Sequence, residues 1–246
     1  MNRLEDSGSP MLPGEIVRLR PCAGVAVLRF DLDSSRIDPA SARALLNPEE
    51  IARAEGFARS EDRRRRLAAR ALLRLTLGSA LGRPPTELMF EGGAHGKLRL
   101  AAAGPAFSLS HSGGRLLIAI SQLGEVGVDV ELPGVGRDLS GAARISFSAD
   151  ELRALGRHEG SERERAFLRI WTAKEAALKA FGVGLQRPMR EVVLDLDALD
   201  TLSATPWQPG LARQDGQDLA LHDVSAKDDV ACLAAISQPG RSNSAG

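Results

Sequence analysis

The sequence is poor in the residues that build metal clusters, disulfide frameworks and nucleic-acid interfaces. Its 246 residues include only two cysteines and four histidines, no tyrosine, and 4% aromatic residues. The cysteines form no CxxC pair and the histidines no HExxH pair, so we expect neither a zinc site nor a disulfide framework. Cys22 and Cys232 both lie in apolar stretches, which favours small buried side chains.

The chain also lacks an excess of charge and any long apolar run. Its 32 basic and 32 acidic residues give a formal net charge of zero, whereas general nucleic-acid and membrane-surface binders normally carry a basic excess. No run approaches transmembrane length, and the first residues contain no apolar signal core. We therefore expect a cytoplasmic protein with no nucleic-acid or membrane partner.

The segment Phe167–Gly182, FLRIWTAKEAALKAFG, has the composition of a helix but breaks a packing rule. At about 100° per residue, one face collects the large apolar side chains Phe167, Ile170, Trp171, Leu178 and Phe181. Lys174 falls in the middle of this face, Glu175 at its edge, and Lys179 one turn beyond Glu175. A buried lysine is costly unless an anion partners it, and such exceptions often mark functional sites. The alternatives are that Lys174 reaches the surface and that Glu175 and Lys179 form an ordinary exposed pair.

The chain contains an internal repeat. Three pairs of segments recur in the same order: Asn47–Phe57 with Ser148–His158, Ser60–Gly82 with Gly160–Gly182, and Arg115–Gln122 with Ala231–Gln238. In the second pair, Arg74 lies opposite Lys174. We infer two related lobes, 14–123 and 124–238, between flexible tails 1–13 and 239–246. Chance similarity between Ala/Arg/Leu-rich helices is the alternative.

Each lobe is expected to combine strands with a long helix. Strands are expected at Val25–Leu32, Ala106–Ser110, Leu116–Ser121, Val126–Glu131, Glu191–Leu196, Asp218–His222 and Val230–Ile236. Helices are expected at Pro48–Ala58, Glu61–Leu81, Ala149–Leu155 and Ser161–Phe181, and a loop at 201–216. Gly82 and Gly182 follow the two long helices, where a C-terminal glycine belongs. This pattern predicts an α+β fold with two pseudo-two-fold-related lobes, each a small, mainly antiparallel sheet packed with a long helix. Because both lobes lie in one chain, we expect a monomer.

The segment Gly127–Glu131, GVDVE, places two acids on one face of a strand. Side chains alternate along a strand, so Asp129 and Glu131 project together while the two valines point the other way. Neighbouring carboxylates repel each other, and a Mg²⁺ ion, which takes one or two carboxylates plus substrate phosphates, would remove that conflict. Glu175 could supply a third carboxylate, and Lys179 could then meet the phosphates. The alternative is an exposed strand edge with two solvated acids.

Val126–Asp129 and Trp171–Lys179 together resemble the two signature motifs of the 4′-phosphopantetheinyl transferases, in the two-lobe form of the surfactin-synthetase-activator type. Weaker similarity extends over Phe57–Arg65, His95–Lys97, Phe107–Ser112 and Ile145–Leu152. The resemblance implies an enzyme that uses coenzyme A and Mg²⁺. Such enzymes transfer the phosphopantetheine arm to a serine of an acyl or peptidyl carrier protein and release adenosine 3′,5′-bisphosphate.

The resemblance also assigns roles in the C-terminal lobe. Asp129, Glu131 and Glu175 would hold Mg²⁺ against the pyrophosphate, and Lys179 would grip the pyrophosphate. Glu175, directly or through a metal-bound water, would take the serine proton; whether it is ligand, base or both stays open. Lys174 has no ligand role in this scheme, and we expect it to pair with a buried acid and hold Glu175 in place.

In the N-terminal lobe, the resemblance implies contacts with coenzyme A. Ser110 and His111 match positions that meet its phosphates, and Arg53, Arg65 and Lys97 match basic positions around the adenosine 3′-phosphate. Glu50 stands where another basic residue is expected, three positions before Arg53.

The carrier protein is expected at about Leu139–Leu155, as part of polyketide or nonribosomal peptide synthesis. The alternative function is a non-catalytic coenzyme A- or carrier-protein-binding module on the same scaffold. A nucleic-acid binder using Arg63–Arg66 is a third, poorer interpretation, because the net charge is zero and aromatic residues are few.

Overall fold

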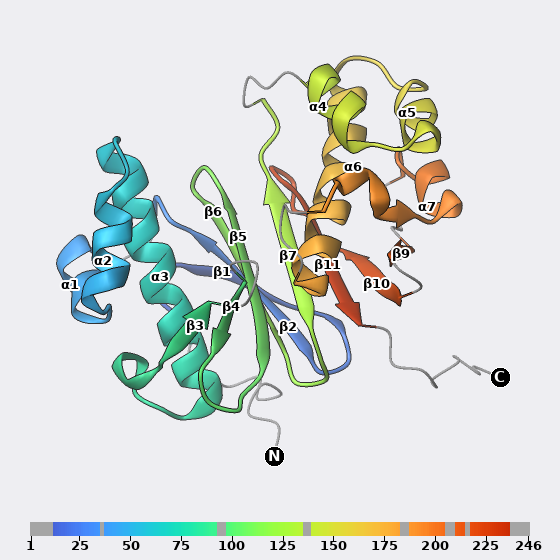
Figure 1. Ribbon diagram of the computed structural model, residues 1–246. Helices are drawn as coiled ribbons and strands as arrows, with labels where there is room; N and C mark the ends of the chain where they lie inside the picture. Colours follow the sequence, from blue (N-terminus) through green and yellow to red (C-terminus); the bar gives the residue numbers. More distant parts are fainter. Residues whose placement is uncertain are drawn as a thin grey trace. The chain divides into compact units, whose positions relative to one another are not determined.

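The computed structural model describes residues 12–34, 37–92, 97–134, 139–182, 187–204, 210–214 and 217–236. The chain divides into two compact units between Leu123 and Gly124. Each unit has its own antiparallel sheet and its own long helix (Figure 1). None of the helices in the described ranges is both long and apolar enough to cross a bilayer.

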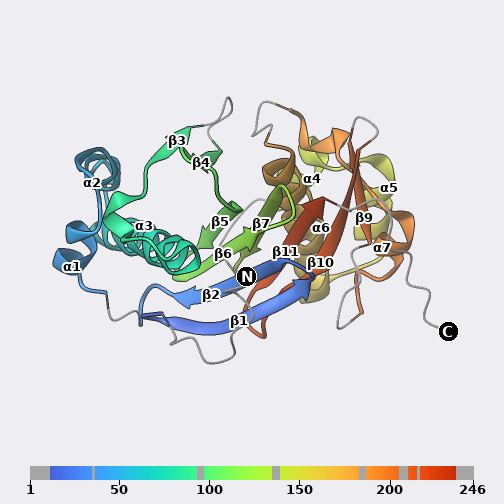
Figure 2. The ribbon, with the colours of Figure 1, turned by 90° about the horizontal axis from the view of Figure 1, so that it is seen from below.

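Unit 1 is built on a four-stranded antiparallel sheet. Its order is β1 (Glu15–Cys22), β2 (Val25–Asp31), β6 (Arg115–Ser121) and β5 (Ala106–Ser112). The long helix α3 (Ser60–Leu81) lies along one face of this sheet (Figure 2). The other elements are α1 (Pro39–Ala44) and α2 (Pro48–Glu55), which pack against α3, the 3-10 turn η1 (Pro85–Glu87), and the hairpin β3 (Phe90–Gly92) and β4 (Leu98–Leu100). Apolar side chains of α3 and of the central strands form its core.

Unit 2 is built on a five-stranded antiparallel sheet. Its order is β7 (Val126–Glu131), β11 (Val230–Ile236), β10 (Gln217–Asp223), β9 (Leu211–Gln214) and β8 (Val193–Leu194). The long helix α6 (Gly160–Phe181) packs mainly against β7 and β11. The remaining elements are α4 (Leu139–Ser146), α5 (Ala149–Leu155), the 3-10 turn η3 (Met189–Glu191) and α7 (Leu196–Asp200) (Figure 1).

The helices of the two units begin and end with the same signals. The short helices α2 and α5 each start at a capping box, in which Asn47 pairs with Glu50 and Ser148 pairs with Glu151. The long helices α3 and α6 each span 22 residues and end at a left-handed glycine, Gly82 at φ 64° and Gly182 at φ 72°. These glycines confirm the predicted helix ends.

The predicted α+β class, with two antiparallel sheets each packed against a long helix, is confirmed. One predicted strand is wrong: Glu191–Leu196 holds the end of η3, the two-residue β8 and the first residue of α7. The reason is local, because the Asp195 carboxylate accepts a hydrogen bond from the Asp197 N–H and starts a helix there. The predicted loop at 201–216 contains β9, and the prediction missed β1, β3, β4, α1 and α4.

The face of α6 that meets β7 is made of small residues. Ala173, Ala176 and Ala180 are buried almost completely. On β7, Gly127 completes the contact: a Cβ there would overlap the carbonyl oxygen of Ala176 and lie 2.5 Å from the backbone nitrogen of Ala180. The helix therefore approaches the strand more closely than any side chain on residue 127 would allow.

Candidate active site

The acids of the GVDVE segment lie on β7, within unit 2. In the antiparallel register with β11, Asp129 is opposite Cys232 and Glu131 opposite Val230. Asp129 is only 4% exposed, and Glu131 is half-buried. The interpretation of two solvated acids on an exposed edge is therefore wrong for Asp129, which must be stabilised by neighbouring groups.

A cationic partner of Asp129 comes from α6. Because Gly127 lets the helix lie against the strand, the Lys179 Nζ lies 2.6 Å from Asp129 Oδ1 and 3.2 Å from the Val128 carbonyl oxygen. The Lys179 side chain remains about 30% exposed. The structure thus joins the two signature segments at a charged contact that retains access to solvent.

Glu175 lies one turn before Lys179 on α6 and is half-buried. Burial raises the pKa of the Glu175 carboxyl, the charge of Asp129 raises it further, the Lys179 ammonium lowers it, and Glu131 raises it again. The charges of Asp129 and Glu131 therefore both act on the Glu175 carboxyl. Such an all-oxygen set suits a hard cation such as Mg²⁺, which would relieve their repulsion.

The three-carboxylate metal set nevertheless stays a prediction. In the described part of the chain, no three His, Cys, Asp or Glu side chains form a group that could hold a metal ion. As the side chains stand, Asp129 binds Lys179.

Lys174 is fully buried in the apolar face of α6. Its Nζ forms an ion pair with Glu151 Oε2 at 2.7 Å, and the two side chains are 0% and 1% exposed. The expected pairing of Lys174 with a buried acid is confirmed, and the alternative in which it reaches the surface is wrong. Burial lowers the pKa of Lys174, and the charge and hydrogen bond of Glu151 oppose that effect.

In unit 1, Ser110 and His111 lie on β5, with Ser110 buried and His111 exposed. Arg65 forms a forked pair with Asp33, in which Nε donates to Oδ1 at 2.9 Å and Nη2 to Oδ2 at 2.7 Å. Asp33 also packs against Gly114 in the turn between β5 and β6, where a Cβ would lie 2.9 Å from the Asp33 Cγ. Asp33 therefore holds Arg65 near the β5–β6 turn. This turn lies at the end of β5 that carries His111.

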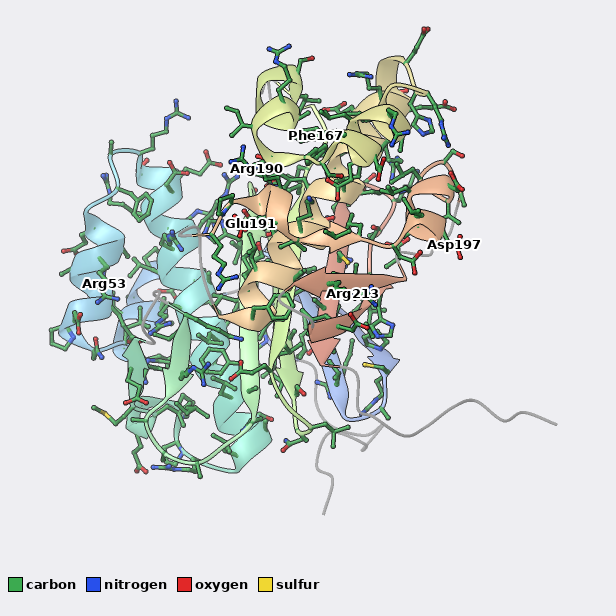
Figure 3. All side chains as sticks on the ribbon, turned by 45° about the vertical axis from the view of Figure 1, so that its right-hand side comes forward. Arg53, Phe167, Arg190, Glu191, Asp197 and Arg213 are labelled. Carbon is green, nitrogen blue, oxygen red and sulfur yellow. The ribbon has the colours of Figure 1, made fainter. Side chains whose placement is uncertain are left out.

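The other basic residues expected around coenzyme A lie elsewhere in unit 1. Arg53 projects from α2 with its side chain 73% exposed and forms an ion pair with Glu49 at 2.5 Å (Figure 3). Lys97 is half-buried immediately before β4. Glu50, which stands where a basic residue was expected, is buried and accepts hydrogen bonds from Arg70 at 2.6 Å and Arg74 at 2.8 Å. It is therefore a structural acid.

Comparison with known proteins decides the family. The model described as "4'-phosphopantetheinyl transferase superfamily" matches residues 125–234, which include β7 and α6. The chain is 32% identical over 220 residues to the 4′-phosphopantetheinyl transferase HetI of Nostoc sp., covering 88% of each chain. The chain belongs to the 4′-phosphopantetheinyl transferase superfamily.

Two further relatives are similar over shorter stretches. A putative 4′-phosphopantetheinyl transferase of Synechocystis sp. is 37% identical over 156 residues, which is 62% of this chain and 63% of that protein. A transferase of Bacillus pumilus is 34% identical over 140 residues, or 56% of this chain and 58% of that protein. The family and the enzyme class predicted from the signature motifs are confirmed: the protein is a 4′-phosphopantetheinyl transferase acting on carrier proteins, and the family implies coenzyme A as its substrate.

Sequence reasoning missed two acids that support the transferase site. Glu151 was overlooked as the partner of Lys174, although Ser148-Ala-Asp-Glu151 is a capping-box pattern that marks this position. Asp33 was overlooked as the partner of Arg65, and it gave no signal, because a single acid in a loop 32 residues away has no pattern.

Proposed function

We propose that the transferase moves the 4′-phosphopantetheine arm of coenzyme A to a carrier-protein serine at the end of β7 and the facing turn of α6. Asp129, Glu131 and Glu175 would hold Mg²⁺, and Lys179 would bind the pyrophosphate. The observation that carries this assignment is the 2.6 Å contact between Lys179 Nζ and Asp129 Oδ1, beside a carboxylate whose pKa both β7 acids raise. It brings both signature segments into one polar site.

The reaction has a defined balance of bonds. The serine oxygen attacks the β-phosphorus of coenzyme A, and the bond from that phosphorus to the oxygen of the leaving adenosine 3′,5′-bisphosphate breaks. Mg²⁺, when bound, would neutralise the pyrophosphate charge. The serine proton would pass to the Glu175 carboxylate, and Lys179 would orient the pyrophosphate through its ammonium.

The adenosine end of coenzyme A is assigned to unit 1. Arg65 would bind the 3′-phosphate, with Lys97 and Arg53 as further basic groups, and Ser110 and His111 would meet the phosphates. Support comes from Arg65, whose guanidinium is held in a forked geometry, the geometry that also recognises phosphate, next to the β5–β6 turn.

The carrier protein is assigned to the α4–α5 segment, Leu139–Leu155. This segment is partly apolar at its surface, because Ile145 is 73% exposed. It packs against α6, the helix that carries Glu175 and Lys179. The proposal includes that the enzyme is monomeric and cytoplasmic, and that it primes carrier domains of polyketide or nonribosomal peptide synthases.

One assay tests the proposal directly. The protein is incubated with coenzyme A, Mg²⁺ and several apo carrier proteins, and mass spectrometry should show addition of phosphopantetheine to the carrier. Asp129→Asn and Glu175→Gln should each abolish the addition while circular dichroism shows a folded chain, and Asp218→Asn, in an exposed ion pair with Arg213, serves as control. If both site variants keep full activity, the site assignment is wrong.

The alternative, a non-catalytic module on this scaffold, predicts a different result. In a sample shown to be folded, calorimetry would show coenzyme A binding, and the mass assay would show no gain on any carrier protein.

A further inference from the structure

The ion pair between Lys174 and Glu151 connects the proposed carrier-binding segment to the helix that carries the candidate catalytic acid. Lys174 Nζ lies 2.7 Å from Glu151 Oε2 and 3.5 Å from the carbonyl oxygen of Ser146, the last residue of α4. It also lies 5.9 Å from the centre of the Phe147 ring. One buried ammonium therefore contacts the end of α4, the α4–α5 connection and the first turn of α5.

Glu151 is itself part of the structure that starts α5. Its Oε2 accepts the Ser148 N–H at 2.7 Å, and its own N–H donates to Ser148 Oγ at 3.3 Å. Phe147 packs against Phe167 of α6 in a tilted arrangement, with ring centres 5.1 Å apart, and Figure 3 shows Phe167 among the side chains of α4 and α5. Removing the lysine charge would leave the Glu151 carboxylate buried with only the hydrogen bond from the Ser148 N–H among the described residues.

The corresponding pair in unit 1, Glu50 and Arg74, has more hydrogen-bond partners. There Glu50 binds both Arg70 and Arg74, and Arg74 also donates to the carbonyl oxygens of Pro85 at 2.8 Å and Leu88 at 2.9 Å.

In unit 2 the position equivalent to Arg70 is occupied by the apolar Ile170. Glu151 Oε1 is buried, and within the described ranges it has no hydrogen-bond partner. Among the residues that the structure describes, Lys174 is thus the only cationic side chain that pairs with Glu151.

The residue after each cation differs between the units. Leu75 follows Arg74, whereas Glu175 follows Lys174. The Lys174–Glu151 ion pair, which also orders the start of α5, therefore fixes the backbone of α6 at the residue next to Glu175.

We propose that Lys174 is a positioning residue for the transfer reaction: its ion pair with Glu151 holds α4–α5 against α6, and so sets both the direction of Glu175 and the shape of the carrier-binding segment. This inference rests on the proposed roles of Glu175 and of α4–α5. It assigns to Lys174 no contact with coenzyme A.

The test compares Lys174→Met with Arg74→Met, which removes the equivalent cation from unit 1. Both variants should lower the Tm, by about 10 °C, since each leaves a buried carboxylate with less charge compensation. At a temperature where both are folded, only Lys174→Met should lower kcat, by about tenfold, and raise KM for the carrier protein. Calorimetry should show that both bind coenzyme A as the unaltered enzyme does.

Hydrogen exchange supplies a readout that does not depend on turnover. Backbone amides of 148–155 should exchange faster in Lys174→Met, and those of 47–55 faster in Arg74→Met. Lys174→Arg, which restores a cation of the kind found in unit 1, should recover most of kcat. Should Lys174→Met fail to fold, Glu151→Gln keeps the side-chain shape and should give the same kinetic change.

Equal kinetic losses in Lys174→Met and Arg74→Met, or losses confined to Tm, would overturn the inference. The parent proposal fails differently, because full activity of Glu175→Gln would refute the assignment of Glu175 whatever Lys174 does.

Discussion

The Asp33 carboxylate occupies the forked face of the Arg65 guanidinium, with N–O distances of 2.9 and 2.7 Å. The hydrogen bond from Arg65 lowers the pKa of the Asp33 carboxyl, burial raises it, and a hydrogen bond from Arg64 lowers it further. Asp33 is therefore a charged counterion, supplied by the protein itself, of the arginine assigned to the 3′-phosphate. A phosphate that binds Arg65 has to share the guanidinium with Asp33 or displace it.

Arg65→Gln is expected to raise KM for coenzyme A about tenfold, the equivalent of about 1.4 kcal/mol. Dephospho-coenzyme A, which lacks only the 3′-phosphate, should show the same KM with the variant and the unaltered enzyme. Steady-state kinetics with both substrates makes this comparison. An equal rise for both substrates would mean that Arg65 supports the fold of unit 1 and does not bind the 3′-phosphate.

Lys179→Met is expected to separate metal binding from turnover. The Lys179 ammonium, 2.6 Å from Asp129 Oδ1, competes with any cation for that carboxylate. Without it, Mg²⁺ affinity in the absence of coenzyme A should rise about threefold, while turnover falls by about 100-fold because the pyrophosphate loses its cation. Isothermal calorimetry with Mg²⁺ and the mass assay measure the two effects.

The matched control for that variant is Lys227→Met, which removes an exposed lysine of the turn before β11. It should change neither Mg²⁺ affinity nor turnover. Weaker Mg²⁺ binding by Lys179→Met would show that the lysine organises Asp129 and does not compete for it.

Gly127→Ala should damage unit 2 directly. The added methyl group would overlap the backbone of Ala176, and backbone cannot move aside as a flexible side chain can. We expect a loss of unfolding free energy of about 3 kcal/mol, at the upper end of ordinary overpacking. Activity should fall as well, since α6 moves away from β7. Gly92→Ala, where a Cβ meets nothing within 4 Å, is the control in chemical denaturation; equal stability of the two variants would contradict the close approach.

Glu50 should make the stability of the transferase sensitive to acid. Burial alone would raise the pKa of Glu50, but hydrogen bonds from Arg74 and from the Asn47 N–H, with the charge of Arg70, lower it overall. A carboxyl with a lowered folded pKa contributes its full stability above the unfolded value of about 4.3 and loses it as pH falls through the folded pKa.

Glu50→Gln should therefore cost about 3 kcal/mol at pH 7, because Arg74 is left buried without its acid. The difference from the unaltered protein should shrink as pH falls below about 4. Thermal unfolding between pH 3 and 7 measures it. Glu49→Gln, whose exposed pair with Arg53 should contribute less than about 1 kcal/mol, provides the baseline, and a constant difference across this range would contradict the prediction.

Local patterns predicted what depends on local physics. The helix period of Phe167–Gly182 located α6 and the buried position of Lys174, and the glycines after both long helices located their ends. Alternation in GVDVE located β7, and the two signature segments identified the family.

Features set by distant partners could not be derived in the same way. β1, with its arginines, is a strand because β2 pairs with it, and the weak Glu191–Leu196 pattern gave way to the Asp195 helix start. The pairing of Arg65 with Asp33 depends on a loop conformation that no periodicity encodes. The structural role of Glu50 could not be derived from its departure from the expected basic residue, because its partners Arg70 and Arg74 are set by the fold.

The paired acids Glu50 and Glu151, each bound to a cation of the long helix, also bear on how such a protein can change. The cation, Arg74 or Lys174, holds the long helix in place through its ion pair. The next residue does not take part in that ion pair, so it can be apolar in unit 1 (Leu75) and acidic in unit 2 (Glu175). A single substitution at that following position can add a carboxylate to one unit while its scaffold stays as it was. In a chain with two similar units, unit 2 can therefore gain a catalytic residue by one substitution while both units keep the same fold.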